Sequence, residues 1–275
     1  MYTVRTLITF LLMGSAASWA AKTIVVPSQT AGTIAQAFLR AKAGDTVLVK
    51  DAVYREKIFV KSGIILKAET PGHAIVDGGG KGVVVSLGRD AQIWGFTVQN
   101  GTIGVFSKHP GCVIRQCRVI RNWQTGIICV RHLPHIENSV IAFNRGSGIQ
   151  GWDVRSTKPD VSLIHNVIAY NGNNGIAMGG KSELVVQYNT IAENVRLGVK
   201  LLSEAQGVTL VGNNFFGNMS AIGGLPNGNL SYDPQFVSPR KQLDFTSNAK
   251  DGCKECSPDK VPGLFAKGSL HRYKN

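Results

Sequence analysis

The chain has 275 residues, with 30 Lys and Arg against 17 Asp and Glu and a formal net charge of +13. Its basic residues form no run and no nucleic-acid recognition motif, which argues against a nucleic-acid partner. Beyond the N-terminus no apolar stretch approaches the length of a transmembrane helix. Length and charge together predict one folded unit, which we expect to be monomeric, with an anionic partner.

Residues 1–20 have the pattern of a secretory signal peptide. Arg5 precedes an apolar core over 7–13, and Ser18-Trp19-Ala20 is a small-x-small cleavage site. We expect cleavage near Ala20 and a protein that is secreted or periplasmic.

Residues 33–44 break an otherwise strand-like pattern and predict the one convincing helix. Thr33 to Gln36 forms a capping box, an apolar stripe follows, and Gly44 comes after the last turn. An amphipathic helix of this kind can cover the open end of a sheet structure. The segments 46–50, 57–60, 63–67 and 74–77 then predict strands separated by turn residues.

From Gly95 to Gly223 a short pattern is repeated six times. An asparagine recurs at Asn100, Asn122, Asn144, Asn171, Asn194 and Asn218, spaced by 22, 22, 27, 23 and 24 residues. In the first five repeats a glycine follows four residues later, at Gly104, Gly126, Gly148, Gly175 and Gly198. Self-similarity at such a period indicates a solenoid.

The repeat predicts strands, because no apolar run is long enough for a helix. A path of about 22 residues at about 3.3 Å each can turn several corners and return about 4.8 Å above its start. A leucine-rich repeat would need Leu at fixed positions that are absent here. We therefore predict an all-β chain forming a single-stranded parallel β-helix with an N-terminal capping helix. The asparagine is expected to adopt the left-handed backbone of a corner and to bond the next coil, and the glycine to supply a second permissive corner.

Two stretches resemble a known family. The order TIAQAF…AGDTVLVKDAVYREKIFVKSGIILKA…IVDGGG is similar to the N-terminal region of exported pectin-lyase-like right-handed β-helix proteins. Asp233-Pro234-Gln235-Phe236 resembles the D-P-x-F segment that often ends such domains. The resemblance implies a right-handed β-helix over 21–240, including its N-terminal cap, followed by a C-terminal cap or tail over 241–275.

In that family the substrate lies across an outer sheet face and its bordering loops, so the strands after the repeat glycines are the candidate site. Period-2 alternation turns Phe106, Gln150 and Lys200 outward if the residue after each glycine points inward. The longest excursion, 151–160, carries Trp152, which can stack on a sugar ring. The expected substrate-binding residues are Lys108, His132, Gln150, Trp152 and Lys200.

An acidic polysaccharide is the expected partner, and β-elimination on uronic acids is the leading enzyme hypothesis. A lyase needs a base and cations that stabilise the resulting anion, for which Arg131, Arg155 and Lys181 are the candidates. Asp153 and Asp160 are candidate ligands for Ca²⁺, although no cluster of three or four acids is present. The paired-carboxylate motifs of β-helix polygalacturonases and the D-P-H signature of mannuronan epimerases are absent. The alternative is a non-catalytic carbohydrate-binding or cell-surface structural protein.

The five cysteines are an odd number. Cys112, Cys117 and Cys129 lie in neighbouring repeats and are expected to be buried thiols, whereas Cys253 and Cys256 could pair in an oxidising compartment.

Overall fold

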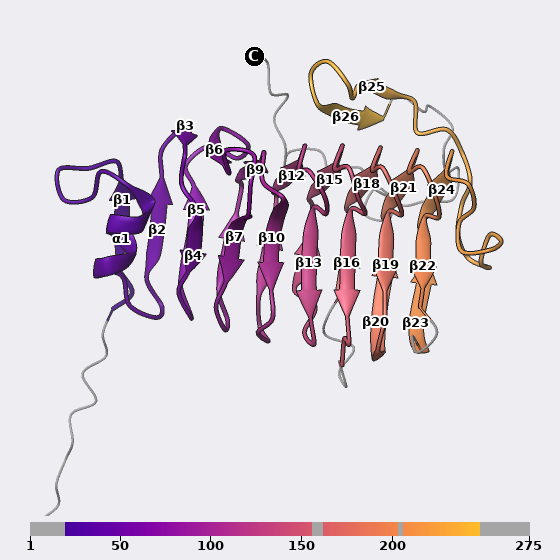
Figure 1. Ribbon diagram of the computed structural model, residues 1–275, viewed down its shortest axis with the longest axis horizontal. Coiled ribbons are helices and arrows are strands. Elements are labelled where there is room, and N and C mark those ends of the chain that lie inside the picture. Colours follow the sequence, from indigo (N-terminus) through magenta and orange to yellow (C-terminus); the bar gives the residue numbers. More distant parts are fainter. Residues whose placement is uncertain (1–19, 156–161, 203–205, 248–275) are drawn as a thin grey trace, which may run out of the picture.

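A computed structural model describes residues 20–155, 162–202 and 206–247. The chain winds as a right-handed parallel β-helix in which successive coils each add one short strand to each of three parallel sheets (Figure 1). The predicted fold class is therefore confirmed. A two-stranded antiparallel hairpin follows the last coil.

The strands of each sheet stack in chain order. The nine-stranded sheet contains β1 (Thr23–Val26), β2 (Thr46–Val49), β5 (Ile65–Ala68), β8 (Gln92–Trp94), β11 (Val113–Arg115), β14 (His135–Glu137), β17 (Ser162–Ile164), β20 (Lys181–Gln187) and β23 (Gln206–Val211). The seven-stranded sheet contains β4 (Ile58–Val60), β7 (Val83–Leu87), β10 (Ile103–Ser107), β13 (Ile127–Val130), β16 (Ile149–Trp152), β19 (Ile176–Met178) and β22 (Val199–Leu201). The eight-stranded sheet contains β3 (Ala52–Tyr54), β6 (Ala74–Asp77), β9 (Thr97–Gln99), β12 (Arg118–Ile120), β15 (Val140–Ala142), β18 (Val167–Ala169), β21 (Thr190–Ala192) and β24 (Asn214–Phe216).

The core is a set of apolar rows that run along the solenoid axis. Ile93, Ile114 and Ile136 pair in register in the nine-stranded sheet, and all three are fully buried. Because alternate residues of a strand point to opposite faces, each inward row leaves an outward row beside it. The outward rows are therefore the surfaces on which a site can be built.

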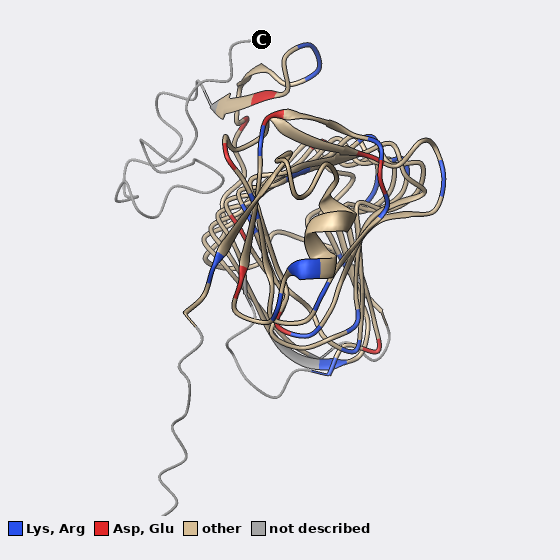
Figure 2. Cartoon of the chain, turned by 90° about the vertical axis from the view of Figure 1, so that its left-hand side faces the viewer, with Lys and Arg blue, Asp and Glu red and all other residues tan. Residues whose placement is uncertain are grey.

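The predicted N-terminal helix is confirmed as α1 (Ile34–Arg40), which ends earlier than expected because Ala41 already has extended backbone. Thr33 Oγ1 accepts a hydrogen bond from the Gln36 N–H at 3.1 Å, and Gln36 Oε1 accepts one from the Gly32 N–H at 2.8 Å. The helix lies over the open end of the solenoid (Figure 2). Within the described residues no helix is long and apolar enough to span a membrane.

An asparagine ladder follows the eight-stranded sheet at the corner where the chain turns toward the seven-stranded sheet. Asn171 is fully buried; its Nδ2 donates to Asn194 Oδ1 at 2.9 Å, and its Oδ1 accepts from Asn144 Nδ2 at 3.0 Å. The predicted bonding between coils is confirmed. The left-handed backbone, however, belongs to the residue before each asparagine, such as Tyr170 with φ 55° and Glu193 with φ 56°. The asparagine therefore connects neighbouring coils by hydrogen bonds, and the residue before it makes the turn.

Asn100 is not part of this ladder, contrary to the expectation from spacing. It has φ 56° and donates to Asp77 Oδ1, whereas the N–H of Gly101 donates to Asn122 Oδ1 at 3.0 Å. The corner after Gly101 is one residue shorter than the corner after Asn122, since Gly104 and Gly126 still occupy equivalent places. The shift could not be seen in the sequence, because Asn100 and Asn122 both stand four residues before a glycine.

The repeat glycines are also needed for a reason other than the expected one. None of Gly104, Gly126, Gly148, Gly175 and Gly198 has a positive φ. A Cβ added to Gly126 would lie 2.7 Å from Asn144 Nδ2 and 2.7 Å from the Gly148 carbonyl oxygen. The glycine is required because the next coil approaches too closely for a side chain.

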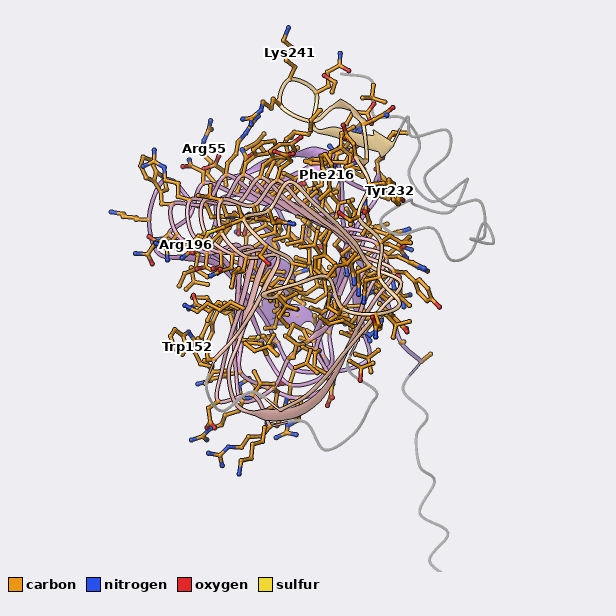
Figure 3. The ribbon with its side chains drawn as sticks, turned by 90° about the vertical axis from the view of Figure 1, so that its right-hand side faces the viewer. Arg55, Trp152, Arg196, Phe216, Tyr232 and Lys241 are labelled. Atoms are coloured by element: carbon orange, nitrogen blue, oxygen red, sulfur yellow. The ribbon has the colours of Figure 1, made fainter. Side chains whose placement is uncertain are left out.

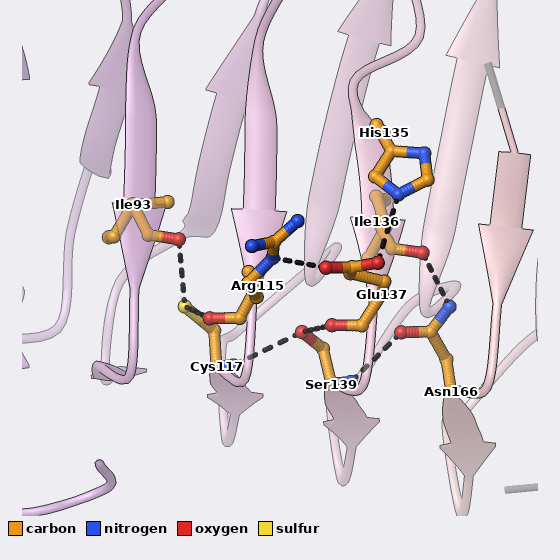
Figure 4. Close-up of polar contacts among 8 residues, drawn as sticks. All are labelled: Ile93, Arg115, Cys117, His135, Ile136, Glu137, Ser139 and Asn166. Atoms are coloured by element: carbon orange, nitrogen blue, oxygen red, sulfur yellow. Dashed lines mark hydrogen bonds and ion pairs between the residues drawn. The ribbon is translucent and has the colours of Figure 1, made fainter. Parts of the chain in front are cut away.

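A second ladder, which the repeat pattern did not reveal, stabilises the corner between the nine- and eight-stranded sheets. The Ser139 N–H donates to Asn166 Oδ1 at 2.9 Å, and Ser139 Oγ accepts from the Cys117 N–H at 3.1 Å (Figure 4). Asn189, Asn213 and Asn229 continue the ladder in the following coils. The solenoid is thus held at two of its three corners by buried amides.

The C-terminal hairpin of β25 (Phe236–Ser238) and β26 (Asp244–Ser247) packs on the outer face of the eight-stranded sheet (Figure 1). Phe245 is 3% exposed and lies in a tilted arrangement against Phe143 and Tyr170, with ring centroids 6.0 and 6.4 Å away. Phe236 of the D-P-x-F segment packs edge-on against Phe245. The hairpin therefore covers part of one face and leaves the seven-stranded sheet open.

Candidate functional site

The outer face of the seven-stranded sheet carries one continuous row of side chains. From β4 to β22 the row consists of Phe59, Ser86, Phe106, Ile128, Gln150, Ala177 and Lys200. The expected outward direction of Phe106, Gln150 and Lys200 agrees with the buried residues that flank them. Phe59 is 55% exposed, and Lys200 is exposed at the other end of the row. The face is thus a narrow, mainly apolar strip.

Basic side chains border this strip where the strands end. Lys108 follows β10, Arg131 follows β13, and both are exposed. The Arg155 N–H donates to the Arg131 carbonyl at 2.8 Å and the Arg131 N–H to the Trp152 carbonyl at 3.0 Å, so these residues belong to stacked coils. Trp152 is 47% exposed. We call this edge, made of Lys108, Arg131, Trp152 and Arg155, the strand-end rim.

Asp153 lies between two guanidinium groups of the strand-end rim. Arg155 Nε donates to its Oδ1 at 2.8 Å, and Arg131 Nε is 4.0 Å from its Oδ2. The hydrogen bond from Arg155, aided by both positive charges, lowers the pKa of Asp153 below its usual value. The Asp153 carboxylate is therefore ionised and is already paired with two arginines of its own chain.

The geometry gives little support to the calcium expectation. Asp160, the second predicted ligand, lies outside the described residues, and so does the rest of the excursion over 156–161. In the described part of the chain no three His, Cys, Asp or Glu side chains come together as a metal site. Two guanidinium groups beside Asp153 would also repel a divalent cation.

The remaining expected residues lie at different parts of the corner. His132 is half-buried directly after Arg131. Lys181 is exposed at the start of β20, whose register with β23 places it in the nine-stranded sheet. The structure thus brings Arg131, Trp152 and Arg155 together, whereas Lys181 lies beyond the turn that follows β19.

The sequence reasoning missed the opposite edge of the same face. There the Arg145 guanidinium stacks on the Trp123 ring at 3.8 Å, and Trp123 is 48% exposed. Arg196 is exposed on the same corner, two coils further, and Figure 3 shows it on the same side of the molecule as Trp152. Trp123 and Arg145 each follow a ladder asparagine directly, so their alignment could have been found from the repeat.

Both edges of the face are rich in positive charge. Exposed cations on the face or beside it include Lys57, Lys61, Lys81, Arg89, Lys108, Arg131, Arg145, Arg155, Arg196 and Lys200. A strip with aromatic side chains and cations along two edges attracts extended polyanions whose rings can stack. This arrangement can hold a charged chain along the solenoid.

Another polar cluster, also missed from the sequence, lies on the outer face of the nine-stranded sheet. Trp94 is placed between Lys67 and Arg115, at 5.6 and 5.0 Å from its ring centroid. Arg115 forms an ion pair with Glu137, whose Oε2 lies 3.2 Å from His135 Nε2 (Figure 4). This tryptophan already contacts two cations of its own chain and is partly buried, so we do not place the site here.

The fold and its charged face define a pectin-lyase-like right-handed β-helix protein. The chain belongs to the family described as periplasmic copper-binding protein (NosD), whose model matches residues 43–235. Membership of a periplasmic family agrees with the expected export. No curated protein sequence matches the chain.

Similar solved structures share this architecture. Pectate lyase Pel9A has a TM-score of 0.55 and 15% identity over 90% of each chain. Alginate lyase from Paenibacillus sp. str. FPU-7 has a TM-score of 0.47 and 14% identity, over 77% of this chain and 95% of that one. The A-module of the Azotobacter vinelandii mannuronan C-5 epimerase AlgE4 has a TM-score of 0.45 and 16% identity, and this chain spans 66% of its length. At these identities the likeness shows the fold alone.

The donor set of the described residues does not fit copper. Copper prefers thiolate, thioether and imidazole ligands, yet no three His, Cys, Asp or Glu side chains come together within 20–155, 162–202 and 206–247. Cys112, Cys117 and Cys129 are buried free thiols, as expected. Burial raises the pKa of Cys117 and of Cys129 to about 12, so both thiols are protonated at neutral pH. Cys253 and Cys256 lie outside the described residues.

Proposed function

We propose that this protein binds an acidic polysaccharide along the outer face of its seven-stranded sheet. The observation that carries the proposal is the pair of cationic, tryptophan-bearing edges on either side of one apolar strip. Trp152 with Arg131 and Arg155 forms one edge, and Trp123 with Arg145 forms the other. The expected export of the chain would place it where such polymers are found.

The arrangement of the cations favours binding over catalysis. They recur from coil to coil along the solenoid, so a polymer with regularly spaced carboxylates can contact several of them at once. Each exposed ion pair contributes little, about 0.2–1 kcal/mol, and affinity therefore depends on their number. We infer a binding protein whose affinity for polyuronates comes from many weak contacts.

Titration with polygalacturonate and alginate at low and physiological salt tests this proposal. The Arg131→Ala, Lys200→Ala double variant should lose affinity about tenfold at low salt, because two contacts of the face are removed. The matched control Arg40→Ala, Lys50→Ala removes the same charge from exposed positions elsewhere and should bind like the parent. Binding should weaken as the screening length shortens to about 8 Å at 0.15 M salt. Equal affinities for the two double variants would refute this face as the site.

β-Elimination is a second candidate function, favoured by the carboxylate of Asp153 between two guanidinium groups. A uronate carboxylate that displaced Asp153 would meet the same two cations, which would stabilise the anion formed when the proton on the neighbouring carbon is removed. Lys181, the remaining candidate from the sequence, lies at the adjoining corner and would be the base that takes the proton from C5. The electrons of the C5–H bond would form the C4–C5 double bond as the glycosidic C4–O bond breaks, so that the preceding sugar leaves with that oxygen and the product is an unsaturated uronate.

Absorbance of unsaturated product during incubation with polyuronates separates the two candidates. A lyase produces steadily increasing absorbance that the Arg131→Ala, Arg155→Ala variant lacks. A binding protein gives none, although it retains saturable affinity for the same polymers.

A further inference from the structure

The outer face of the eight-stranded sheet is only partly covered by the C-terminal hairpin. Leu243 and Phe245 pack over the coils from β12 onward, where Val140 and Val167 are buried. Toward the N-terminus, the same face is open and forms a groove of about 670 Å³ between the hairpin and the first coils. This groove lies on a different sheet from the proposed polysaccharide face.

The floor of the groove is an outward row that crosses four coils. Val53, Ile75, Thr97 and Arg118 pair in register from β3 to β12. Three steps of about 4.8 Å make it about 14 Å long, which matches about four residues of extended chain. Val53 is 51% exposed, which leaves apolar surface without cover in the described structure.

The two ends of the groove differ in charge. Arg118, Arg121 and Lys241 lie at the end next to the hairpin, and Arg121 and Lys241 are exposed. At the other end the Asp51 carboxylate pairs with His73 Nδ1 at 3.4 Å. The lining thus combines apolar side chains with an excess of positive charge and favours an anionic occupant that also carries apolar groups.

The hairpin shows how a chain fits this face. Phe236 and Phe245 lie on the two extended strands of the hairpin and, together with Leu243 between those strands, pack on the outward rows of the same sheet. The groove continues those rows without interruption. Among the described residues that line the groove there is no tryptophan, tyrosine or phenylalanine on which a sugar ring could stack, whereas the seven-stranded face has several.

We propose that this groove binds an extended acidic peptide of a partner protein, with apolar side chains on Val53 and Ile75 and carboxylates at Arg118, Arg121 and Lys241. The proposal is independent of the polysaccharide site, because it uses another sheet and other residues. The carboxylates would form charge-assisted hydrogen bonds with the arginines, which are stronger than neutral ones.

Fluorescence anisotropy of a labelled peptide of about eight residues tests the proposal. One half of the peptide is valine and the other half glutamate, to match the apolar and the cationic ends of the groove, and it is longer than the four-residue groove so that its ends stay clear. The parent protein should bind it saturably and a lysine–valine peptide of the same length at least tenfold more weakly. Arg121→Glu, Lys241→Glu should reduce affinity for the acidic peptide at least tenfold at low salt, and Val53→Asn should reduce it severalfold. The control Arg40→Glu, Arg89→Glu makes the same change in net charge away from the groove and should have no effect.

The outcomes are distinguishable. Polyuronate binding should be the same in Arg121→Glu, Lys241→Glu as in the parent, and this result together with loss of the peptide supports the groove. Equal binding of the acidic and basic peptides, or loss of polyuronate in place of peptide in that variant, overturns the proposal. Circular dichroism that matches the parent shows that each variant is folded.

Discussion

Asn171, a buried asparagine of the first corner ladder, uses every hydrogen-bonding position of its side chain. Asn171 Nδ2 donates to the Ile141 carbonyl and to Asn194 Oδ1, and its Oδ1 accepts from both the backbone N–H and Nδ2 of Asn144. A single side chain therefore connects three coils. Its removal leaves partners in two neighbouring coils without a bond.

Asn171→Leu should consequently be strongly destabilising. Leucine has the same number and branching of side-chain heavy atoms but satisfies none of these groups, and each buried polar group left unpaired costs about 1–3 kcal/mol. We expect the free energy of unfolding to fall by more than about 3 kcal/mol, measured by denaturant titration. The same substitution at the exposed Asn227 is the control and should change it by less than about 0.5 kcal/mol. Equal effects at both positions would contradict the ladder.

The thiols of Cys117 and Cys129 should be inert in the folded protein. Burial raises both pKa values from about 9 to about 12, and the thiolate is the reactive form. Peptide mapping after alkylation at pH 8 should find Cys117 and Cys129 unmodified until the protein is unfolded. Both pKa values are higher in the folded protein than in the unfolded chain, so the contribution of the protonated thiols to the free energy of unfolding is fully present below about pH 9. This contribution is lost as pH rises toward about 12. Modification of either thiol at the rate of an unfolded control would contradict their burial.

Residue-scale prediction succeeded where a residue type has one physical use and failed where it has two. Asparagine tolerates left-handed backbone and also bonds neighbouring coils, and the sequence does not say which use applies. Asn100 adopts the first and Asn122 the second, at the same distance from the following glycine. The second ladder escaped detection because it starts with Ser139 in place of an asparagine, although Asn166, Asn189 and Asn213 each stand five residues before an asparagine of the first ladder.

At the scale of elements, the C-terminal hairpin is the least regular part of the described structure and depends on a few aromatic contacts. Its two strands pair at Phe236 with Ser247 and at Ser238 with Asp244 across an irregular register. The Phe143 and Tyr170 rings, stacked at 5.2 Å, form the platform for Phe245. The hairpin should thus detach without unfolding the solenoid.

Phe245→Ala should show this separation. Hydrogen exchange should become fast for the amides of β25 and β26 while those of β15 and β18 keep their protection, because the coil-to-coil bonds do not involve the hairpin. The control Val237→Ala changes a side chain that is 46% exposed and should leave all protection unchanged. Simultaneous loss of protection in the hairpin and in the coils would show that the solenoid depends on the hairpin for its stability.

The helix and the first strands could be predicted because their signals are local. Thr33 and Gln36 specify the N-cap by themselves, and the apolar stripe of α1 needs only helical periodicity. The docking of Phe236 and Phe245 could not be predicted, since it depends on which sheet face the returning chain meets. The D-P-x-F resemblance indicated an end to the coils and not the place where the chain goes next.

For the whole molecule, the sequence repeat made the architecture predictable, but only one of the two edges of the candidate site was predicted from it. A period of about 22 residues can close a coil in few ways, so the repeat alone specified the solenoid. The strand-end rim followed from alternation along each strand. The alignment of Trp123 and Arg145 could also have been found from the repeat, because each directly follows a ladder asparagine, whereas the stacking of the Arg145 guanidinium on the Trp123 ring is visible only in the structure.

The length of the charged face leads to the last prediction. The face spans seven strands, from Phe59 to Lys200, and six steps of about 4.8 Å make it about 29 Å long. If an acidic polysaccharide lies along it, each added sugar contacts further cations until the oligomer reaches the end of the face. Affinity for size-fractionated oligouronates, measured by calorimetry, should therefore rise with chain length and level off once the oligomer extends to about 29 Å. The salt dependence should steepen over the same range, since more ion pairs are formed.

Arg131→Ala, Lys200→Ala should lower the affinity that the longest oligomers reach and leave the affinity of the shortest oligomers nearly unchanged. Affinity that is already maximal for a disaccharide would instead indicate one compact subsite, and the extended face would then be wrong.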